Sequence, residues 1–226
     1  MSTVHFLGFG AGYYPAFGPT AAWFREGTRL YMMDCGTSAF ERLVRAGALD
    51  GCTGVTVFLS HVHADHVGSL GILLDYCYDM LGIVPLLVHP DAGVNELLRR
   101  MGVTPEAYRY APQMQQADEN GVVAEFFPVL HAPDISCFGY ILRTADDCFC
   151  YTGDANAFPA QALEGLNAGR IDRVYQDTAS HPSAHHCFLG RLQEAVPPEL
   201  RGRVFCVHLD CDCREQIRAA GFRLPE

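Results

Sequence analysis

The sequence feature that most constrains this chain is a run of four metal-binding side chains within residues 61–66, His61-Val62-His63-Ala64-Asp65-His66. The run follows residues 55–59, an apolar and β-branched segment of strand length. Apolar residues then recur at positions 70, 73, 74 and 77, a spacing typical of one face of a helix. The motif is therefore predicted to lie on a loop that joins a strand to a helix.

The order of the residues within this loop predicts a site for more than one ion. In extended backbone, His61 and His63 point to the same side, whereas Asp65 and His66 begin the helix and can point to a neighbouring position. A solvated polar turn would explain one histidine, but it does not explain three histidines and an aspartate directly after a buried strand. Imidazole and carboxylate ligands suit zinc, and also manganese or iron, so the motif predicts a metal site without fixing the ion.

Length and composition exclude several other classes of protein. A chain of 226 residues with 49% hydrophobic residues can bury a substantial core, and we expect a single domain over residues 1–226. The N-terminal Met1-Ser2-Thr3-Val4-His5 lacks a basic region followed by an apolar region, so we expect no signal peptide, and no apolar run reaches the ~18 residues that cross a membrane. The ten cysteines are scattered through the chain, which favours reduced thiols and a cytoplasmic location over a disulfide scaffold.

The charge of the chain bears on its partners. A formal net charge of −10 gives no long-range attraction to a polyanion, and the sequence has no evident basic patch. We therefore expect a small-molecule substrate, no membrane partner and no extended nucleic-acid contact. If the chain associates with itself, we expect a homodimer.

Several other predicted strands also end in a residue that can bind a metal ion. His131 follows the strand at residues 122–130, and Asp154 follows the strand at residues 148–151. Asp177 ends the strand at residues 173–177, and His208 ends the strand at residues 204–208. Scattered structural polar groups would not show this pattern, so we expect these strand ends to converge on one edge, with His131 as a ligand from a third segment.

Other polar residues have simpler interpretations. Asp34 also ends a strand, but we expect it to accept hydrogen bonds rather than to bind a metal ion. His89 is interpreted as a structural histidine. Cys211 and Cys213 would make an incomplete zinc site and are interpreted as incidental thiols. The polar residues 104–120 are expected to form a mobile wall over the site.

Three segments together resemble the metallo-β-lactamase fold superfamily, and within it the ribonuclease Z-like metal-dependent hydrolases. Residues 4–12, Val4-His5-Phe6-Leu7-Gly8-Phe9-Gly10-Ala11-Gly12, are similar to the opening strand and glycine turn of that branch. Residues 33–36, Met33-Asp34-Cys35-Gly36, are similar to its second signature, and residues 61–66 match the superfamily motif at every metal-binding position. The resemblance implies an α/β fold, a four-layer αββα sandwich with the metal ions at one edge.

The resemblance also implies a ligand set for two divalent metal ions, with zinc favoured and manganese or iron(II) as alternatives. One ion would be held by His61, His63 and His131. The other would be held by Asp65, His66 and His208, with Asp154 as the bridge between them. Asp65 also belongs to the expected catalytic residues, because its carboxylate offsets part of the metal charge.

Two further positions match the ribonuclease Z-like branch, which carries an acid and a histidine ahead of the last ligand. Asp177 and His186 fall at these places, although Asp177 replaces the usual glutamate. For a phosphodiester, His186 oriented by Asp177 could protonate the departing alkoxide as a general acid. The adjacent His185 is an alternative for this role. A polar loop that merely contains His181, His185 and His186 is the structural alternative.

Two cations close together make hydrolysis the expected reaction, and the acid–histidine pair favours a phosphodiester. In ribonuclease Z a long exosite arm that clamps transfer RNA lies between the third histidine and the bridging aspartate, but here His131 and Asp154 are only 23 residues apart. We therefore expect a phosphodiesterase for small or cyclic nucleotides. The alternatives are a lactonase or thioesterase, a ribonuclease Z-like RNA endonuclease, and a binding module without turnover, which the complete set of seven ligands disfavours.

Overall fold

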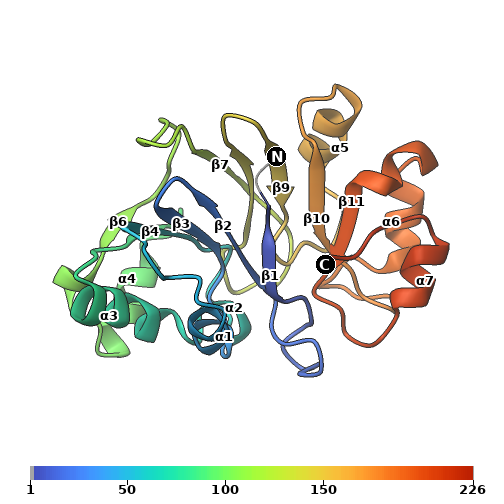
Figure 1. The fold of residues 1–226 in the computed structure, drawn as a ribbon. Coiled ribbons are helices and arrows are strands. Elements are labelled where there is room, and N and C mark those ends of the chain that lie inside the picture. The colour runs from blue at the N-terminus through green and yellow to red at the C-terminus, as the bar shows by residue number, and fades with distance from the viewer. Residues whose placement is uncertain (1–2, 226) are drawn as a thin grey trace.

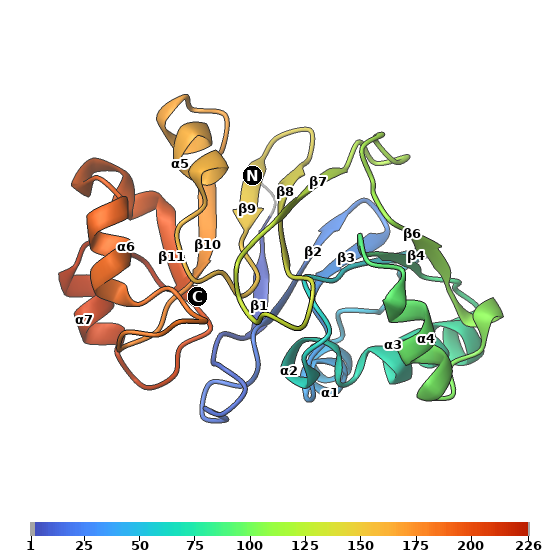
Figure 2. The same ribbon diagram turned by 180° about the vertical axis from the view of Figure 1, so that it is seen from behind.

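Two β-sheets face each other at the centre of the molecule, and helices lie on both outer sides (Figures 1 and 2). This computed structural model describes residues 3–225. The start of the predicted N-terminal segment, Met1 and Ser2, and the last residue of the predicted domain, Glu226, lie outside these residues. The prediction of a single domain therefore stays a prediction.

The first sheet has the strand order β1-β2-β3-β4-β5-β6. Its strands are β1 (His5–Gly8), β2 (Ala21–Glu26), β3 (Arg29–Met33), β4 (Gly54–Phe58), β5 (Leu86–Val88) and β6 (Arg109–Ala111). The pairs β1–β2 and β2–β3 are antiparallel, as expected for a hairpin, whereas β3 to β6 run parallel. The motif at residues 61–66 thus leaves the carboxyl end of a central parallel strand, β4.

The second sheet has the strand order β11-β10-β9-β8-β7. Its strands are β7 (Val123–Pro128), β8 (Phe138–Arg143), β9 (Cys148–Tyr151), β10 (Arg173–Asp177) and β11 (Val204–Val207). Strands β9, β10 and β11 are parallel, and β8 is antiparallel to both of its neighbours. Strands β7, β9, β10 and β11 therefore run in one direction and end at one edge of the sheet, where open α/β sheets commonly bind ligands.

Each sheet has its own helical layer. The helices α1 (Ala39–Arg45), α3 (Leu70–Leu81) and α4 (Gly93–Arg100) cover the first sheet, and α5 (Ala160–Asn167), α6 (Leu189–Ala195) and α7 (Arg214–Ala219) cover the second (Figure 1). The short helix α2 (Ala64–Val67) carries part of the metal motif. Two 3₁₀ turns, η1 (Pro105–Ala107) and η2 (Pro198–Arg203), lie in connections.

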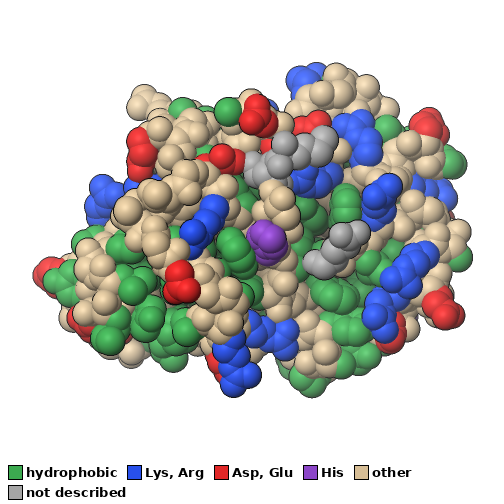
Figure 3. Space-filling model, in the orientation of Figure 1, with side chains coloured by type: hydrophobic (Ala, Val, Ile, Leu, Met, Phe, Trp, Pro, Cys, Tyr) green, Lys and Arg blue, Asp and Glu red, His purple; other side chains and the backbone are tan. Residues whose placement is uncertain are grey.

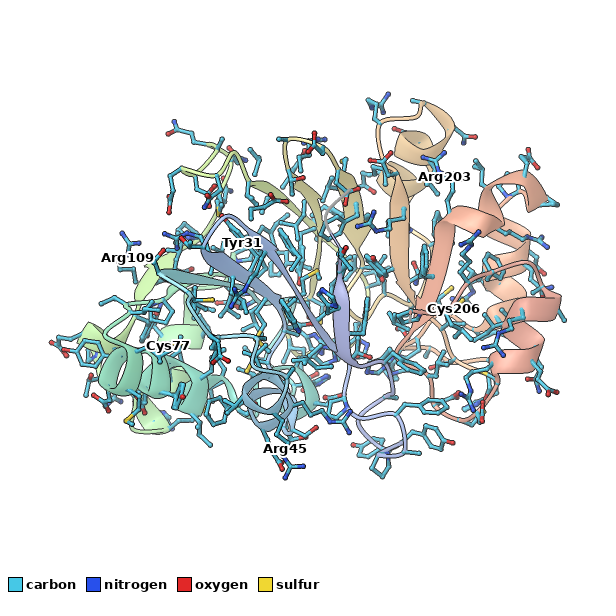
Figure 4. The ribbon with its side chains drawn as sticks, in the orientation of Figure 1. Tyr31, Arg45, Cys77, Arg109, Arg203 and Cys206 are labelled. Atoms are coloured by element: carbon cyan, nitrogen blue, oxygen red, sulfur yellow. The ribbon has the colours of Figure 1, made fainter. Side chains whose placement is uncertain are left out.

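Three clusters of buried side chains lie between the four layers of sheets and helices and hold them together. Tyr31 belongs to the aromatic layer between the sheets, Cys77 to the layer under α3, and Cys206 to the layer under the C-terminal helices (Figure 4). The inter-sheet layer is rich in large rings that stack or meet edge to face, which contributes beyond the buried area alone. The predicted αββα sandwich is thereby confirmed.

The prediction for residues 104–120 was wrong. This stretch forms η1 and the edge strand β6, and none of its residues lines the cavities described below. Tyr108 and Tyr110 pack instead against the core under the first helical layer, and their hydroxyls donate to Asn95 Oδ1 and to the His89 carbonyl. Apolar ring area thus draws the segment onto the core, away from the metal motif. Among the described residues, no helix has the length and apolar character needed to cross a bilayer.

Candidate metal centre

The four side chains of the motif leave β4 in two directions. His63 has extended backbone at the start of α2, whereas Asp65 and His66 lie within that helix. His61 and His66 are fully buried, although imidazoles and carboxylates are usually at least partly exposed. The backbone changes from strand to helix within six residues. This change separates the pair His61 and His63 from the pair Asp65 and His66, as the sequence predicts.

The first pair lies with His131 and Asp154. His63 Nδ1 is 3.0 Å from His61 Nε2 and 3.2 Å from His131 Nε2. Asp154 Oδ2 is 3.5 Å from His131 Nε2 and 3.8 Å from His61 Nε2. His131 follows β7 and Asp154 follows β9, so one group gathers the ends of three strands from both sheets.

The second pair lies with His208 and again with Asp154. Asp154 Oδ1 is 3.2 Å from His66 Nε2, and Asp154 Oδ2 is 3.4 Å from His208 Nε2. Asp65 Oδ2 is 3.3 Å from His208 Nε2 and 3.6 Å from His66 Nε2. The structure therefore brings all seven predicted ligands into two groups that share Asp154.

These distances fit divalent metal ions. Ligands at the usual ~2.0–2.1 Å from a tetrahedral ion lie about 3.4 Å from each other, and the separations given above scatter around that value. His66 Nε2 and Asp154 Oδ1 are buried without a hydrogen-bond partner although they face each other. Orphaned buried polar atoms are costly, and a cation between them would satisfy both. The residues thus fit the divalent ions that the fold implies.

Two glycines allow backbone to approach Asp65 closely. A Cβ on Gly12 would lie 2.6 Å from Asp65 Oδ2, and a Cβ on Gly36 would overlap the Asp65 carbonyl oxygen. These glycines belong to the turn at residues 8–12 and to the segment at residues 33–36, the other two segments of the resemblance. The lack of a side chain at these two glycines therefore lets both segments pack directly against the second ligand group.

Asp34 orients His66. Its buried carboxylate accepts hydrogen bonds from Ser60 N at 2.7 Å, Ser60 Oγ at 2.8 Å, His66 Nδ1 at 2.8 Å and Tyr151 OH at 3.1 Å. The His66 Nδ1 bond leaves Nε2 free to face Asp154, which is the arrangement of a metal-binding imidazole. The interpretation of Asp34 as a hydrogen-bond acceptor is confirmed, but the sequence did not reveal Ser60 and Tyr151 as its partners.

Backbone strain also marks this centre. Among the described residues, only Asp34 and His208 are non-glycine residues with positive φ, both at 58°. The His208 N–H donates to Thr20 Oγ1 at 3.1 Å, which holds this backbone after β11 ends at Val207. Strained residues of this kind cluster at functional sites, where the surrounding structure keeps them in place.

The loop after β10 places His185 and His186 differently. His186 Nδ1 donates to Asp177 Oδ2 at 2.8 Å, a hydrogen-bond distance shorter than the separation of two ligands on one ion. His185 Nδ1 instead bonds to the His131 carbonyl at 2.9 Å, and His131 Nδ1 donates to the His185 carbonyl at 2.9 Å. The geometry therefore favours His186 as the partner of Asp177 and gives His185 a role in orienting His131.

The charges of the centre support cation binding. Burial raises the pKa of Asp154, but the charges of His208 and His66 more than offset this, so its pKa is well below the usual range. Burial lowers the pKa of His61 well below its usual value, which keeps this imidazole neutral, as a ligand must be. Burial lowers the pKa of His208, but Asp154 and then Asp177 and Asp65 raise it to about 10. The negative charge of the carboxylates in this cluster therefore exceeds the positive charge of its histidines, which favours the binding of a cation.

His186 differs from the ligands in its electrostatics. Burial lowers its pKa, but the hydrogen bond and the charge of Asp177 outweigh burial, so the pKa of His186 is raised above its ordinary value. A raised pKa keeps a larger fraction of the imidazole protonated near neutral pH. His186 can therefore act as a proton donor.

Both ligand groups open into a cavity of about 660 Å³, which borders a smaller cavity of about 140 Å³. Ala11, Tyr13, His186 and His208 line both of them. The sequence did not identify Tyr13, Thr37 or Asp134 as lining residues, because isolated loop residues carry no periodic signal.

Two other predicted features lie outside these groups. His89 is buried and its Nδ1 bonds to the Leu59 carbonyl at 2.9 Å, which confirms the structural interpretation. Cys211 and Cys213 lie with Asp210 within 4.8 Å, but the Asp210 carboxylate already accepts from Ser180 and pairs with His181. All ten cysteines are unpaired.

Comparison with known proteins now identifies the family. A family model described as the metallo-beta-lactamase superfamily matches residues 15–219. The chain belongs to the metallo-beta-lactamase superfamily. Its ligand clusters and fold are those of a metallo-hydrolase that uses divalent metal ions.

Individual relatives agree with this assignment. The chain is 27% identical over 210 residues to the anti-Pycsar protein Apyc1 of Paenibacillus xerothermodurans, covering 84% of this chain and 80% of that protein. It is 28% identical over 167 residues to a ribonuclease Z of Mycobacterium sp. (strain KMS), covering 64% of this chain and 57% of that protein. The fold resembles the metallo-beta-lactamase fold protein YhfI from Bacillus subtilis, with a TM-score of 0.76, 15% identity, and coverage of 96% and 90% of the two chains. The resemblance to the superfamily and to ribonuclease Z-like proteins is thereby confirmed.

Proposed function

We propose that this chain is a dinuclear metal-dependent phosphodiesterase that acts on a small or cyclic nucleotide-type phosphodiester. The observation that carries the proposal is the hydrogen bond of 2.8 Å between His186 Nδ1 and the buried Asp177, beside two ligand groups that share Asp154. Hydrolysis of an alkyl diester requires protonation of a poor leaving group, and this pair supplies a proton donor next to the metal-binding groups.

In this proposal His61, His63 and His131 hold one ion, Asp65, His66 and His208 hold the other, and Asp154 bridges both. When bound, the two ions lower the pKa of the attacking water and neutralise charge that develops on the phosphoryl oxygens. Asp65 and Asp154 offset part of the metal charge. Zinc is the favoured ion, with manganese and iron(II) as alternatives, because imidazole and carboxylate suit all three.

His186 is the proposed general acid. Its Nδ1 proton is committed to Asp177, so Nε2 is the atom that donates a proton to the departing oxygen. After donation the neutral imidazole keeps its bond to Asp177 and is reprotonated from water. Asp177 is fully buried, which fixes the orientation and tautomer of His186 throughout the reaction.

Several features support a small substrate. The interval between His131 and Asp154 is filled by the short strands β8 and β9, which leaves no length for an arm that could clamp a folded RNA. On the face in Figure 3, basic side chains occur at separate places with acidic and apolar ones between them. A net charge of −10 also opposes extended contact with a polyanion.

The remaining expectations belong to the same proposal. We infer a reducing, cytoplasmic location from the ten unpaired cysteines, several of which are buried in the cores. The single domain and the homodimer remain predictions, which light scattering and limited proteolysis of the purified protein can check.

A substrate panel tests the proposal. The purified protein would be loaded with zinc, manganese or iron(II) and assayed with cyclic nucleotides, dinucleotides, an aryl diester, precursor transfer RNA and an acyl-homoserine lactone. We expect hydrolysis of the small nucleotide diesters and poor cleavage of transfer RNA. Lactone hydrolysis without diesterase activity would assign a carbonyl hydrolase instead. Efficient transfer-RNA processing would assign an RNA endonuclease, and bound metal without turnover on any substrate would indicate a binding module.

A further inference from the structure

The walls of the two cavities contain no basic side chain other than histidine. The sequence has no lysine, and no arginine is among the described residues that line either cavity. Enzymes that bind a terminal phosphate group usually pair it with arginine or lysine. Apart from the metal-binding groups, these cavities therefore offer a second phosphate group no permanent positive charge.

Each of the two cavities has in its wall an acidic side chain that is not a proposed metal ligand. Asp134 lines the larger cavity, is exposed, and makes no ion pair or hydrogen bond with another described residue. Asp210 lines the smaller cavity, where its carboxylate accepts from Ser180 and pairs with His181 Nδ1 at 2.9 Å. Of these two carboxylates, Asp134 is thus the one that no described side chain pairs with.

The rest of the cavity wall suits an uncharged group. The ring of Tyr13 is fully exposed where the two cavities meet, and Ala132 and Pro133 add apolar surface beside Asp134. A nucleoside presents a flat base and a neutral sugar, and aromatic rings stack on bases of any identity. The wall can therefore accept the neutral part of a nucleotide diester, on either side of the scissile bond.

We propose that these cavities select phosphodiesters with a single negative charge and discriminate against substrates that carry a second, terminal phosphate group. The inference rests on the proposed diesterase function, and it narrows the substrate class to cyclic mononucleotides and unphosphorylated dinucleotides. A terminal phosphate adds a charge of about −1.5 to −2 at neutral pH. On a dinucleotide this charge lies within roughly one Debye length of the wall, about 8 Å at physiological salt, so salt weakens the repulsion by Asp134 but does not remove it.

The test compares two dinucleotides that share the same scissile diester, one with a 5′-hydroxyl and one with a 5′-phosphate. We expect kcat/KM of the metal-loaded protein to be about tenfold lower for the phosphorylated substrate, the size expected for charges at this range with the effective dielectric of about 20 that applies near a protein surface. Raising the ionic strength should narrow the gap. Binding of uncleaved phosphorothioate analogues of both dinucleotides, measured by calorimetry, gives a readout that does not depend on turnover.

Variants of Asp134 test whether its charge causes the preference for the unphosphorylated dinucleotide. Asp134→Asn should reduce the preference about threefold or more, and Asp134→Arg should remove or reverse it. Asp146→Asn is the matched control, because Asp146 is an exposed aspartate on the turn between β8 and β9, at the end of β9 opposite Asp154. That variant makes the same charge change and should leave the preference unaltered.

The outcomes separate the two proposals. Equal kcat/KM and equal affinity for both dinucleotides would overturn the charge selection while leaving the diesterase intact. A preference that survives both Asp134 variants unchanged would also overturn it, because the wall charge would not be its cause. Absence of all hydrolysis, with the binding preference and its dependence on Asp134 retained, would overturn the diesterase and support the charge selection.

Discussion

At the scale of single residues, Asp154 is the side chain on which both ligand groups depend. Its two oxygens lie between 3.2 and 3.8 Å from His61, His66, His131 and His208. Replacing it with asparagine removes a buried negative charge and one bridging oxygen while keeping nearly the same volume. We expect Asp154→Asn to lose turnover and to retain fewer than two metal ions per chain.

Metal analysis of the desalted protein by mass spectrometry measures this directly. Asp147→Asn is the matched control, because Asp147 is also buried but pairs with Arg173 at 2.6 Å and is not among the proposed ligands. The control should keep both ions. Retention of two ions by Asp154→Asn would remove Asp154 from its role as the bridge.

His186 should matter only where the leaving group needs a proton. His186→Ala is expected to slow dinucleotide hydrolysis by about 10²–10⁴-fold, the usual contribution of a general acid. Hydrolysis of an aryl diester should change little, because a nitrophenolate leaves without protonation. Steady-state kinetics on both substrates, with metal content measured in parallel, checks the prediction.

His181→Ala controls for disturbance of the same loop. His181 pairs with Asp210 and is not bonded to a proposed ligand. A loss of equal size on alkyl and aryl substrates would show that His186 does not donate the proton. Loss of metal from His186→Ala would instead place His186 among the ligands.

The sequence could predict the ligands of the motif because they are contiguous and follow a strand whose pattern is unambiguous. It could not decide between His185 and His186. These residues are adjacent, and their directions depend on the loop, where Ser183 Oγ accepts from both backbone N–H groups and Asn156 Nδ2 donates to the Ala184 carbonyl. The Asn156 contact joins two distant segments, and such a contact leaves no pattern along the chain.

At the scale of elements, Asp34 links the two sheets at the metal centre. It follows β3 and accepts hydrogen bonds from Ser60 after β4 and from Tyr151 in β9. Asparagine tolerates the positive φ of this position, so Asp34→Asn should keep the backbone while weakening the acceptor for His66 Nδ1. We expect metal affinity to fall about 10–100-fold.

Competition with a metallochromic chelator measures that affinity. Tyr151→Phe is the matched variant, since it removes one hydrogen bond to Asp34 but leaves the bond to His66, and its effect should be smaller. An unchanged affinity in Asp34→Asn would mean that His66 does not need this partner to bind metal.

The element pattern itself was largely predictable, because buried parallel strands are continuous apolar runs and their ends carried the polar residues. Residues 104–120 are the exception, because the sequence contains Tyr108 and Tyr110 but does not show that both rings pack onto the core. Composition reports how polar a segment is on average. It does not report which ring the tertiary structure will bury.

At the scale of the whole molecule, the metal ions should contribute to the stability of the sandwich. Their proposed ligands come from the ends of strands in both sheets, and removing the ions leaves Asp65 and Asp154 facing each other across a largely buried site. An ion present at 1,000 times its dissociation constant stabilises by about 4 kcal/mol per site, and one such site corresponds to roughly 8–16 °C in a chain of this size.

Thermal unfolding before and after chelation, followed by readdition of zinc, checks this value. Magnesium at the same concentration is the control, because it prefers oxygen ligands and keeps its water. A melting temperature that chelation does not change would show that the sandwich is stable without ions at this edge.

The four-layer arrangement could be predicted from the resemblance of three short segments rather than from periodicity. Alternating strands and helices alone would also fit other α/β folds. The structure explains why the segments go together: the two motif glycines and Asp34 all lie against the helix that carries Asp65 and His66.

The most direct test of the account is a titration of the metal-free protein with zinc, with hydrolysis of a small nucleotide diester as the readout. The account predicts that the rate rises until two equivalents of zinc are bound per chain and then stays constant, because each ligand group would hold one ion. Saturation at one equivalent, or no diester hydrolysis with two equivalents bound, would contradict it.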